Sequence, residues 1–270
     1  IYTSMTGANA AAHRQAVLAN NLANASTQGF RAEMANFRSV PLQGSGSSTR
    51  VFALEATSGH LDAPGPAQTT GRNLDAMARG NAWFAVQGLD GTEAYTRGGA
   101  FEVSADGQLV TRTGLPVLSD GGAPIDVPQG AEVALGADGT VSARIAGQLP
   151  QAIGRMKLAT PGTDDPLKRS DDTLFRTASG EALPADEAAR MASGVLEGSN
   201  VNAVESMVGM IAAARKKYQD DPAITLVCAD ACRMHFSKKF DACVIFDSLP
   251  HFPDIALLFQ TAAGSLKAGG

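Results

Sequence analysis

Aromatic residues are scarce in this sequence, and long apolar runs and an excess of basic charge are missing from it. Aromatic residues make up 6%, and no apolar stretch is long enough to cross a bilayer, so we expect no membrane insertion. The chain has 22 basic and 27 acidic residues and a net charge of −5, which argues against a nucleic-acid partner. Residues 1–24 lack the basic-then-apolar order of a cleaved secretory signal.

Cysteine is missing before Cys228, and its distribution divides the chain. All three cysteines lie after residue 220, together with five of the 11 phenylalanines but only three of the 29 glycines. Hydrophobic residues make up 44% and charged residues 18% of the 270, which indicates a folded chain of one or two domains. The abrupt change in composition near residues 216–222 predicts two unlike pieces.

Small and apolar residues recur through residues 1–22 at intervals of four and three. This heptad pattern predicts a helix with one continuous stripe that faces a partner. A lone helix of this length is marginal in water, so it must pack on its own domain or on a neighbouring molecule. An ordinary terminal helix and an assembly helix are both open alternatives. The stripe consists of Ile1, Met5, Ala8, Ala12, Ala19 and Leu22, with Gln15 in the same series.

An asparagine-rich run follows this helix between residues 20 and 31. Asn20, Asn21 and Asn24 are of a residue type that ends helices and tolerates left-handed backbone, and Gly29 can close a turn. The run predicts a helix stop followed by a fixed turn whose side-chain amides bond backbone groups. The alternative is a polar loop with no further role.

The middle of the chain has the pattern of an arm followed by β-structure. Residues 41–73 are rich in Gly, Ser, Thr and Pro, which predicts an extended arm with one or two short strands. Residues 74–191 predict an antiparallel β-domain, because short β-prone runs are separated by Asp-Gly pairs without a crossover helix. Each pair favours a hairpin in which both turn residues reach positive φ. The expected strands are 83–86, 94–96, 101–103, 108–111 and 133–135, and the pairs begin at Asp90, Asp106, Asp120 and Asp138.

A second helix is predicted from residue 197 to 216, within the segment 192–217. Asn202, with Glu205 three residues later, forms a capping arrangement near its start. Its apolar residues are spaced three, four and three positions apart, so they form a stripe that can pair with the first one. This second stripe consists of Val201, Val204, Val208 and Ile211.

Several segments of this first piece resemble the flagellar basal-body rod and hook family. Residues 20–30, Asn-Asn-Leu-Ala-Asn-Ala-Ser-Thr-Gln-Gly-Phe, are similar to the family's N-terminal signature. Residues 80–86, 95–101 and 107–110 resemble its central segment, and residues 194–204 resemble the start of its C-terminal helix. The matches keep the family's order and span residues 1 to about 216.

The resemblance implies a structural subunit of the proximal rod, not an enzyme, with no cofactor. Members of this family pair their terminal helices to form the inner tube, and an antiparallel β-domain lies outside it, so the implied fold is mainly β with paired terminal α-helices. The flagellar type III apparatus exports such chains without cleaving a signal, which suits the lack of cysteine in residues 1–216. The implied partners are other rod subunits, copies of itself and the export apparatus. The implied location is the periplasmic rod of the basal body.

Under this resemblance, assembly is expected to depend on the two stripes and on the turn. The stripe residues are Ile1, Met5, Ala8, Ala12 and Leu22 on the first helix and Val201, Val204, Val208 and Ile211 on the second. The residues expected to fix the turn that leads out of the tube are Asn20, Asn21, Leu22, Asn24, Thr27, Gly29 and Phe30.

Residues 218–270 follow a different pattern of strand, loop, strand and helix. They resemble the middle of a class I S-adenosylmethionine-dependent methyltransferase. In that family the acid at the position of Asp230 contacts the adenine end of the cofactor, and His251 would lie near the substrate. No glycine-rich turn precedes them, so we expect a partial, Rossmann-like α/β fragment without catalysis. The alternatives are a methyltransferase with a rod-type extension and a fusion that has neither activity.

The two pieces meet near residues 215–218. The rod-type helix should continue beyond Lys216, but Pro222 ends it. We therefore expect a fusion of two unrelated sequences that cannot assemble a normal rod, and whose apolar strand 244–246 promotes aggregation. No metal site is expected, because Cys228, Cys232, His235 and Cys243 do not have the spacing of a zinc site.

Overall fold

The computed structural model describes residues 2–41, 51–170, 172–204, 206–209 and 212. The chain divides into two compact units, residues 1–206 and residues 207–270. The predicted Rossmann-like fragment at 218–270 lies outside the described residues. Among the residues that are described, no helix is long and apolar enough to cross a membrane.

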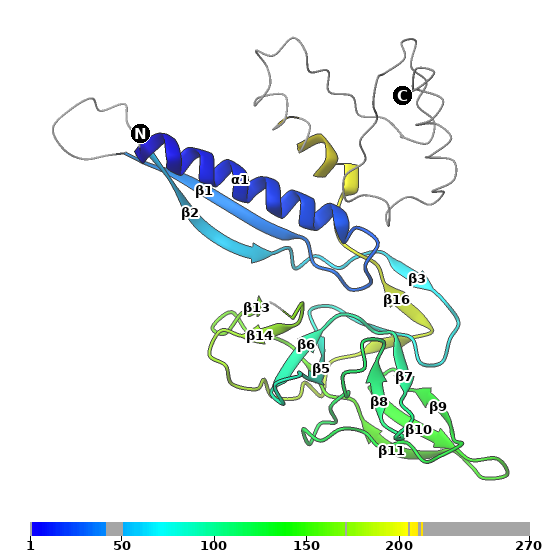
Figure 1. Ribbon diagram of the computed structural model, residues 1–270. Helices are drawn as coiled ribbons and strands as arrows, with labels where there is room; N and C mark the ends of the chain where they lie inside the picture. The colour runs from blue at the N-terminus through cyan, green and yellow to red at the C-terminus, as the bar shows by residue number, and fades with distance from the viewer. Residues whose placement is uncertain (1, 42–50, 171, 205, 210–211, 213–270) are drawn as a thin grey trace, which may run out of the picture. The chain divides into compact units, whose positions relative to one another are not determined.

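The N-terminal helix α1 (Tyr2–Ala23) lies along a hairpin of two long strands (Figure 1). Strand β1 (Glu33–Pro41) pairs antiparallel with β2 (Val51–His60) along its whole length, with a bulge after Asn36. The segment 41–73 therefore contains a longer strand than the short ones that its composition predicts. Continuous backbone pairing with β1 overrides the weak local propensity of this segment. That residues 41–73 form a separate extended arm stays a prediction.

The rest of the first unit is built from short antiparallel strands, which confirms the mainly β fold. A five-stranded sheet has the order β12-β5-β6-β14-β13, a three-stranded sheet has the order β11-β10-β9, and three strand pairs are β7-β8, β15-β4 and β16-β3. The strands are β3 (Ala67–Thr69), β4 (Ala76–Ala78), β5 (Trp83–Gln87), β6 (Glu93–Thr96), β7 (Phe101–Val103), β8 (Leu109–Thr111), β9 (Glu132–Leu135), β10 (Thr140–Arg144), β11 (Gln151–Arg155), β12 (Leu158–Ala159), β13 (Leu167–Arg169), β14 (Phe175–Thr177), β15 (Met191–Ser193) and β16 (Val195–Glu197).

The Asp-Gly pairs lie in turns, as predicted, but the turn type differs from the expected one. Between β5 and β6, β7 and β8, and β9 and β10, only the glycine has positive φ: 79° at Gly91, 81° at Gly107 and 92° at Gly139. Each of these glycine amides donates to the carbonyl three residues earlier. The expectation that both residues reach positive φ is therefore wrong. A type I turn closed by a left-handed glycine leaves the aspartate at negative φ and still reverses the chain.

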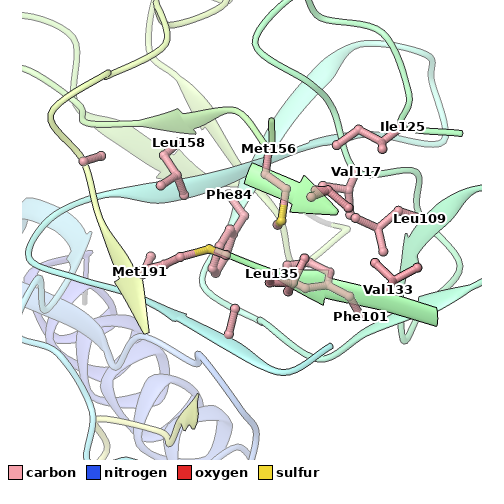
Figure 2. Packing of buried hydrophobic residues seen from close by; sticks show 14 of the residues in the cluster. Phe84, Phe101, Leu109, Val117, Ile125, Val133, Leu135, Met156, Leu158 and Met191 are labelled. Carbon is pink, nitrogen blue, oxygen red and sulfur yellow. The ribbon is translucent and has the colours of Figure 1, made fainter. Parts of the chain in front are cut away.

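The core of the β-domain divides into clusters on the two faces of β5. Figure 2 shows Phe84, Leu135 and Met156 gathered in the larger cluster, where the Phe84 and Phe101 rings meet edge to face with centroids 5.1 Å apart. Trp83 enters a second cluster with Phe175, because successive side chains of a strand point to opposite faces. Burying a side chain of this size contributes roughly 1.5–3 kcal/mol, so β5 is a stable platform for the groups packed around Trp83.

The segment 192–217 begins as strand rather than as helix. Strand β15 pairs with β4, and β16 pairs with β3, so Glu197 ends a strand. Helical residues begin at Ala203, and the Asn202 carbonyl accepts the first helical hydrogen bond, from Ser206 N at 3.0 Å. The predicted start at 197 is therefore wrong by about two turns. Backbone pairing between β16 and β3 holds the residues before Asn202 extended.

Candidate assembly site

Helix α1 buries one face and exposes the face predicted for assembly. Val17 and Asn21 are 7% and 6% exposed, and Thr6, Ala10 and His13 on the same face are half-buried. At 3.6 residues per turn the predicted stripe lies roughly on the opposite face. On that stripe Leu22 is half-buried, Ile1 lies outside the described residues, and the exposed residues are Met5 at 54%, Ala8, Ala12, Gln15 and Ala19.

The second predicted stripe is described only at its beginning. Val201 is half-buried, whereas Val204 and Val208 are 66% and 58% exposed. Ile211 lies outside the described residues. Both stripes thus present apolar or small side chains to solvent, and their roles in assembly stay predictions.

A hydrogen-bonded turn follows α1, as the asparagine-rich run predicts. The backbone N–H of Asn24 donates to the Asn20 carbonyl at 3.1 Å, and Nδ2 of the Asn24 side chain donates to the same carbonyl at 2.9 Å. The Thr27 hydroxyl donates to Asn24 Oδ1 at 3.1 Å. Asn21 bonds Glu33 twice: its Nδ2 donates to the Glu33 carbonyl at 2.9 Å, and its Oδ1 accepts from Glu33 N at 2.8 Å. The side-chain amides therefore close the turn and join it to β1.

Gly29 and Phe30 dock this turn onto the β-domain. Gly29 has φ of 68°, and its amide donates to the Glu197 carbonyl at 2.8 Å. Phe30 is 8% exposed, and the Arg169 guanidinium lies over its ring, 4.2 Å from the centroid. An open cleft of about 620 Å³ lies between the turn and the β-domain, and Asn20, Asn24 and Thr27 are among the residues of the turn that line it.

Directly after Phe30, a buried charge cluster joins three distant segments. The Glu197 carboxylate on β16 pairs with Arg31 at 2.7 Å through Oε1 and with Arg97 at 2.7 Å through Oε2. The side chains of these three residues are at most 1% exposed. Oε1 also accepts from the Gly65 amide at 2.9 Å. Arg31 belongs to the N-terminal segment, Arg97 follows β6, and Glu197 leads into the C-terminal segment.

The two arginines of the cluster are stabilised by backbone carbonyls and an aromatic ring. Arg31 donates to the Ala63 carbonyl at 2.6 Å, and Arg97 donates to the carbonyls of Ala78 and Ala82. Both guanidinium groups lie over the Trp83 ring, at 5.8 and 5.7 Å from its centroid. Burial lowers the pKa of Arg31 and that of Arg97, and the attraction of Glu197 opposes this shift.

Asn200 forms a second link between the N-terminal and C-terminal segments. Its Oδ1 accepts from Ala32 N at 2.6 Å, and its Nδ2 donates to the carbonyls of Leu61 and Ala63 at 2.8 and 2.7 Å. Its backbone amide donates to the Phe30 carbonyl at 3.2 Å. Every hydrogen-bonding group of this side chain is thus directed at backbone of the turn or of the stretch after β2.

Sequence reasoning from residue types missed Arg31, Arg97, Glu197 and Asn200 as site residues. The available signal was weak: Arg97 and Glu197 are single charges beside apolar and small residues that predict strands. A buried charge needs a partner, but nothing in one sequence says which of 22 basic and 27 acidic residues are paired. Asp230, His251 and the cysteine-rich segment lie outside the described residues, and the described ranges contain no group of acidic, histidine or cysteine residues that could hold a metal ion.

Comparisons with known proteins match both the N-terminal segment and the β-domain of this chain. A family model described as "Flagella basal body rod protein" matches residues 1–31, and one described as "Flagellar hook protein FlgE/F/G D1 domain" matches residues 77–143. The flagellar basal-body rod protein FlgF of Salmonella typhimurium is 44% identical, over 84% of this chain and 93% of its own. This chain belongs to the flagellar basal-body rod protein family. The Escherichia coli FlgF is 45% identical over 80% of this chain and 88% of its own, and the Bacillus subtilis rod protein FlgG is 32% identical over 83% and 93%.

A methyltransferase domain model matches residues 177–270 of this rod-family chain. The match begins well before the junction predicted near residues 215–218. Its first part contains β15 and β16, which pair with β4 and β3 of the β-domain. Those residues therefore fold as part of the rod-type unit, and the position of the junction stays a prediction.

Proposed function

We propose that this chain is a structural subunit of the proximal flagellar rod, which assembles through its terminal helices with other rod subunits and with copies of itself. The matched relatives are named as basal-body rod proteins, and this chain spans most of their length. Export by the flagellar apparatus without a cleaved signal, and a place in the periplasmic part of the rod, belong to the same proposal. The lack of cysteine before Cys228 supports it.

One observation carries this proposal: α1 has two faces with separate tasks. One face packs on its own β1–β2 hairpin, so the helix is held without any neighbour. The opposite face exposes the large apolar side chain of Met5 together with Ala8 and Ala12, whose small side chains allow close approach of another helix. A helix that served only its own domain would have no need of a heptad stripe on its solvent face.

Substitutions that introduce negative charge into the exposed stripe of α1 test this proposal. Because residues 218–270 are expected to hinder assembly, the test protein joins residues 1–217 to the C-terminal segment of the Salmonella typhimurium FlgF. We expect this chimera to restore swimming to a strain that lacks FlgF. Ala8→Glu with Ala12→Glu should abolish swimming while the melting temperature stays within about 2 °C, since exposed substitutions usually change stability by less than 0.5 kcal/mol.

The matched control places the same charges elsewhere on α1. Asn9 and Ala16 are also exposed but lie roughly a quarter-turn away from the stripe. Asn9→Glu with Ala16→Glu should swim like the unchanged chimera. Equal loss in both double variants would mean that α1 tolerates no added charge, and the stripe would have no special role. Full swimming by the stripe variant would contradict the proposal directly.

A second candidate function is methyl transfer from S-adenosylmethionine, favoured by the model match to residues 177–270. The measurement that separates the two is calorimetric titration of the full chain with S-adenosylmethionine. We expect no binding, because the sequence offers no glycine-rich turn before Asp230 for the methionine end of the cofactor. Binding in the micromolar range would support the enzyme instead.

A further inference from the structure

The Glu197 carboxylate is shared by three segments that are far apart in sequence. Oε1 receives Arg31 of the N-terminal segment and the Gly65 amide from the stretch before β3. Oε2 receives Arg97 of the β-domain, through Nε at 2.8 Å and Nη2 at 2.7 Å. The two oxygens thus hold different segments, and the two arginines reach a carboxylate partner here only when β16 is in place.

The charges of this cluster do not allow it to form in part. Two guanidinium groups and one carboxylate leave a net charge of +1 in a site where the three side chains are at most 1% exposed. Without Glu197, Arg31 and Arg97 would face each other over one Trp83 ring with only carbonyl partners. Removing one member of a buried ionic cluster is far more costly than losing an exposed pair, because an uncompensated charge remains. Once β16 leaves, the N-terminal turn therefore loses the carboxylate that offsets the charge of Arg31.

We propose that Glu197 is a positioning residue that couples the docking of the two terminal segments, so that they attach to the β-domain together or not at all. Arg31 follows the turn that leads from α1, and Glu197 precedes the start of the C-terminal helix by a few residues. Their shared site sets the point from which both segments leave the β-domain. The purpose of this coupling, correct placement of two assembly helices, rests on the proposed function.

Coupling of this kind must act in both directions, because the free energy that links two binding events is reciprocal. A change on the N-terminal side should therefore loosen the C-terminal side, and the reverse. Asn21 offers a perturbation on the N-terminal side that does not touch the cluster, since within the described ranges its side chain bonds the Glu33 backbone. Glu197→Gln supplies the perturbation on the other side.

Amide hydrogen exchange of the purified full-length chain tests this coupling by local opening. In Glu197→Gln we expect at least tenfold faster exchange at the amides of Gly29, Ala32 and Glu33. These amides donate to the Glu197 carbonyl, Asn200 Oδ1 and Asn21 Oδ1, respectively. The amides of Ala85 and Leu109 in the β-domain should be unchanged.

The reciprocal arm uses Asn21→Ala. It should speed exchange at the Gly198 and Asn200 amides, which bond the carbonyls of Pro66 and Phe30, again with Ala85 unchanged. The matched control is Glu132→Gln, which breaks an exposed pair with Arg144 and should alter neither terminal segment.

Three results would overturn the coupling. The first is unchanged exchange at Gly29 in Glu197→Gln. The second is an Asn21→Ala effect confined to the N-terminal turn. The third is equal acceleration at Ala85 and Gly29 in both variants, which would make the cluster an ordinary part of the global fold. Because the exchange measurement needs no rod, failure of rod assembly leaves this test untouched, and failure of the coupling leaves the proposed function standing.

Discussion

Gly29→Ala is the substitution that most sharply tests how the turn docks. Gly29 has φ of 68°, a left-handed conformation that residues with a side chain rarely adopt. A Cβ atom there would lie 2.4 Å from the Arg97 carbonyl carbon and 2.5 Å from the Gly98 nitrogen. Both are backbone atoms, so no side chain can move aside to make room.

The expected cost has two parts. Left-handed backbone costs roughly 1–2 kcal/mol for a non-glycine residue. Forcing an extra methyl group into a packed site costs roughly 1–3 kcal/mol more. Gly71 supplies the matched control, because it has φ of 72° but nothing within 4 Å of its Cβ position. Gly71→Ala should therefore show only the first part.

Fluorescence of Trp83 reports on this docking, because it is the chain's single tryptophan and lies under Arg31 and Arg97. For a unit of this size, 1 kcal/mol corresponds to about 2–4 °C in melting temperature. We expect Gly29→Ala to lower the midpoint of thermal unfolding by about 10 °C and Gly71→Ala by about 4 °C. Equal shifts in the two variants would refute the close approach of the turn to Arg97.

Three further predictions concern single side chains of the same unit. Thr173 has φ of 68° in a turn of the kind that glycine closes elsewhere in the chain. Thr173→Gly should therefore relieve backbone strain and raise the midpoint of thermal unfolding, measured by calorimetry, by about 2 °C. A lower midpoint would contradict the presence of strain at this residue. Burial lowers the pKa of His60 below its usual 6.5, and the positive charges of Arg31 and Arg169 act in the same direction. The neutral His60 ring therefore stabilises the fold above pH 6.5, and this stabilisation is lost as the pH falls through the lowered pKa. Urea unfolding at pH 7.5 and 5.5 should show a smaller pH effect in His60→Gln, and an equal effect would exclude His60 as its source. Asn200→Asp sets a carboxylate against two carbonyls and should cost about 2–3 kcal/mol in urea unfolding, whereas a loss below 1 kcal/mol would contradict the bonding assigned to this side chain.

Local signals in the sequence predicted much of the fold. Alternation and turn residues are short-range properties, so the strands around Trp83, Phe101 and Val133 were predicted close to their observed bounds. The turn type was not, because an Asp-Gly pair is compatible with both a primed turn and a type I turn closed by glycine. The start of the second helix was also missed, because the pairing of β16 with β3 depends on residues more than a hundred positions away.

The candidate site was predictable only on its local side. The turn after α1 follows from Asn20, Asn24 and Thr27, whose bonds are short-range. The pairing of Arg31 with Glu197 is a long-range contact between single charges, and composition and spacing contain no information about it. The second face of α1 was missed for a related reason: Val17 and Asn21 are buried by a hairpin whose strands have weak local propensity.

The most direct test of the central claim, that assembly uses the exposed stripe of α1, is disulfide cross-linking in isolated basal bodies. Residues 1–217 of the chimera contain no cysteine, so chosen pairs of cysteines can be introduced into this part of the chain. Ala8→Cys or Ala12→Cys, combined with Val208→Cys, should give disulfide-linked chains, and Asn9→Cys with Val208→Cys should not. Linking through Asn9 but through neither stripe residue would contradict the account.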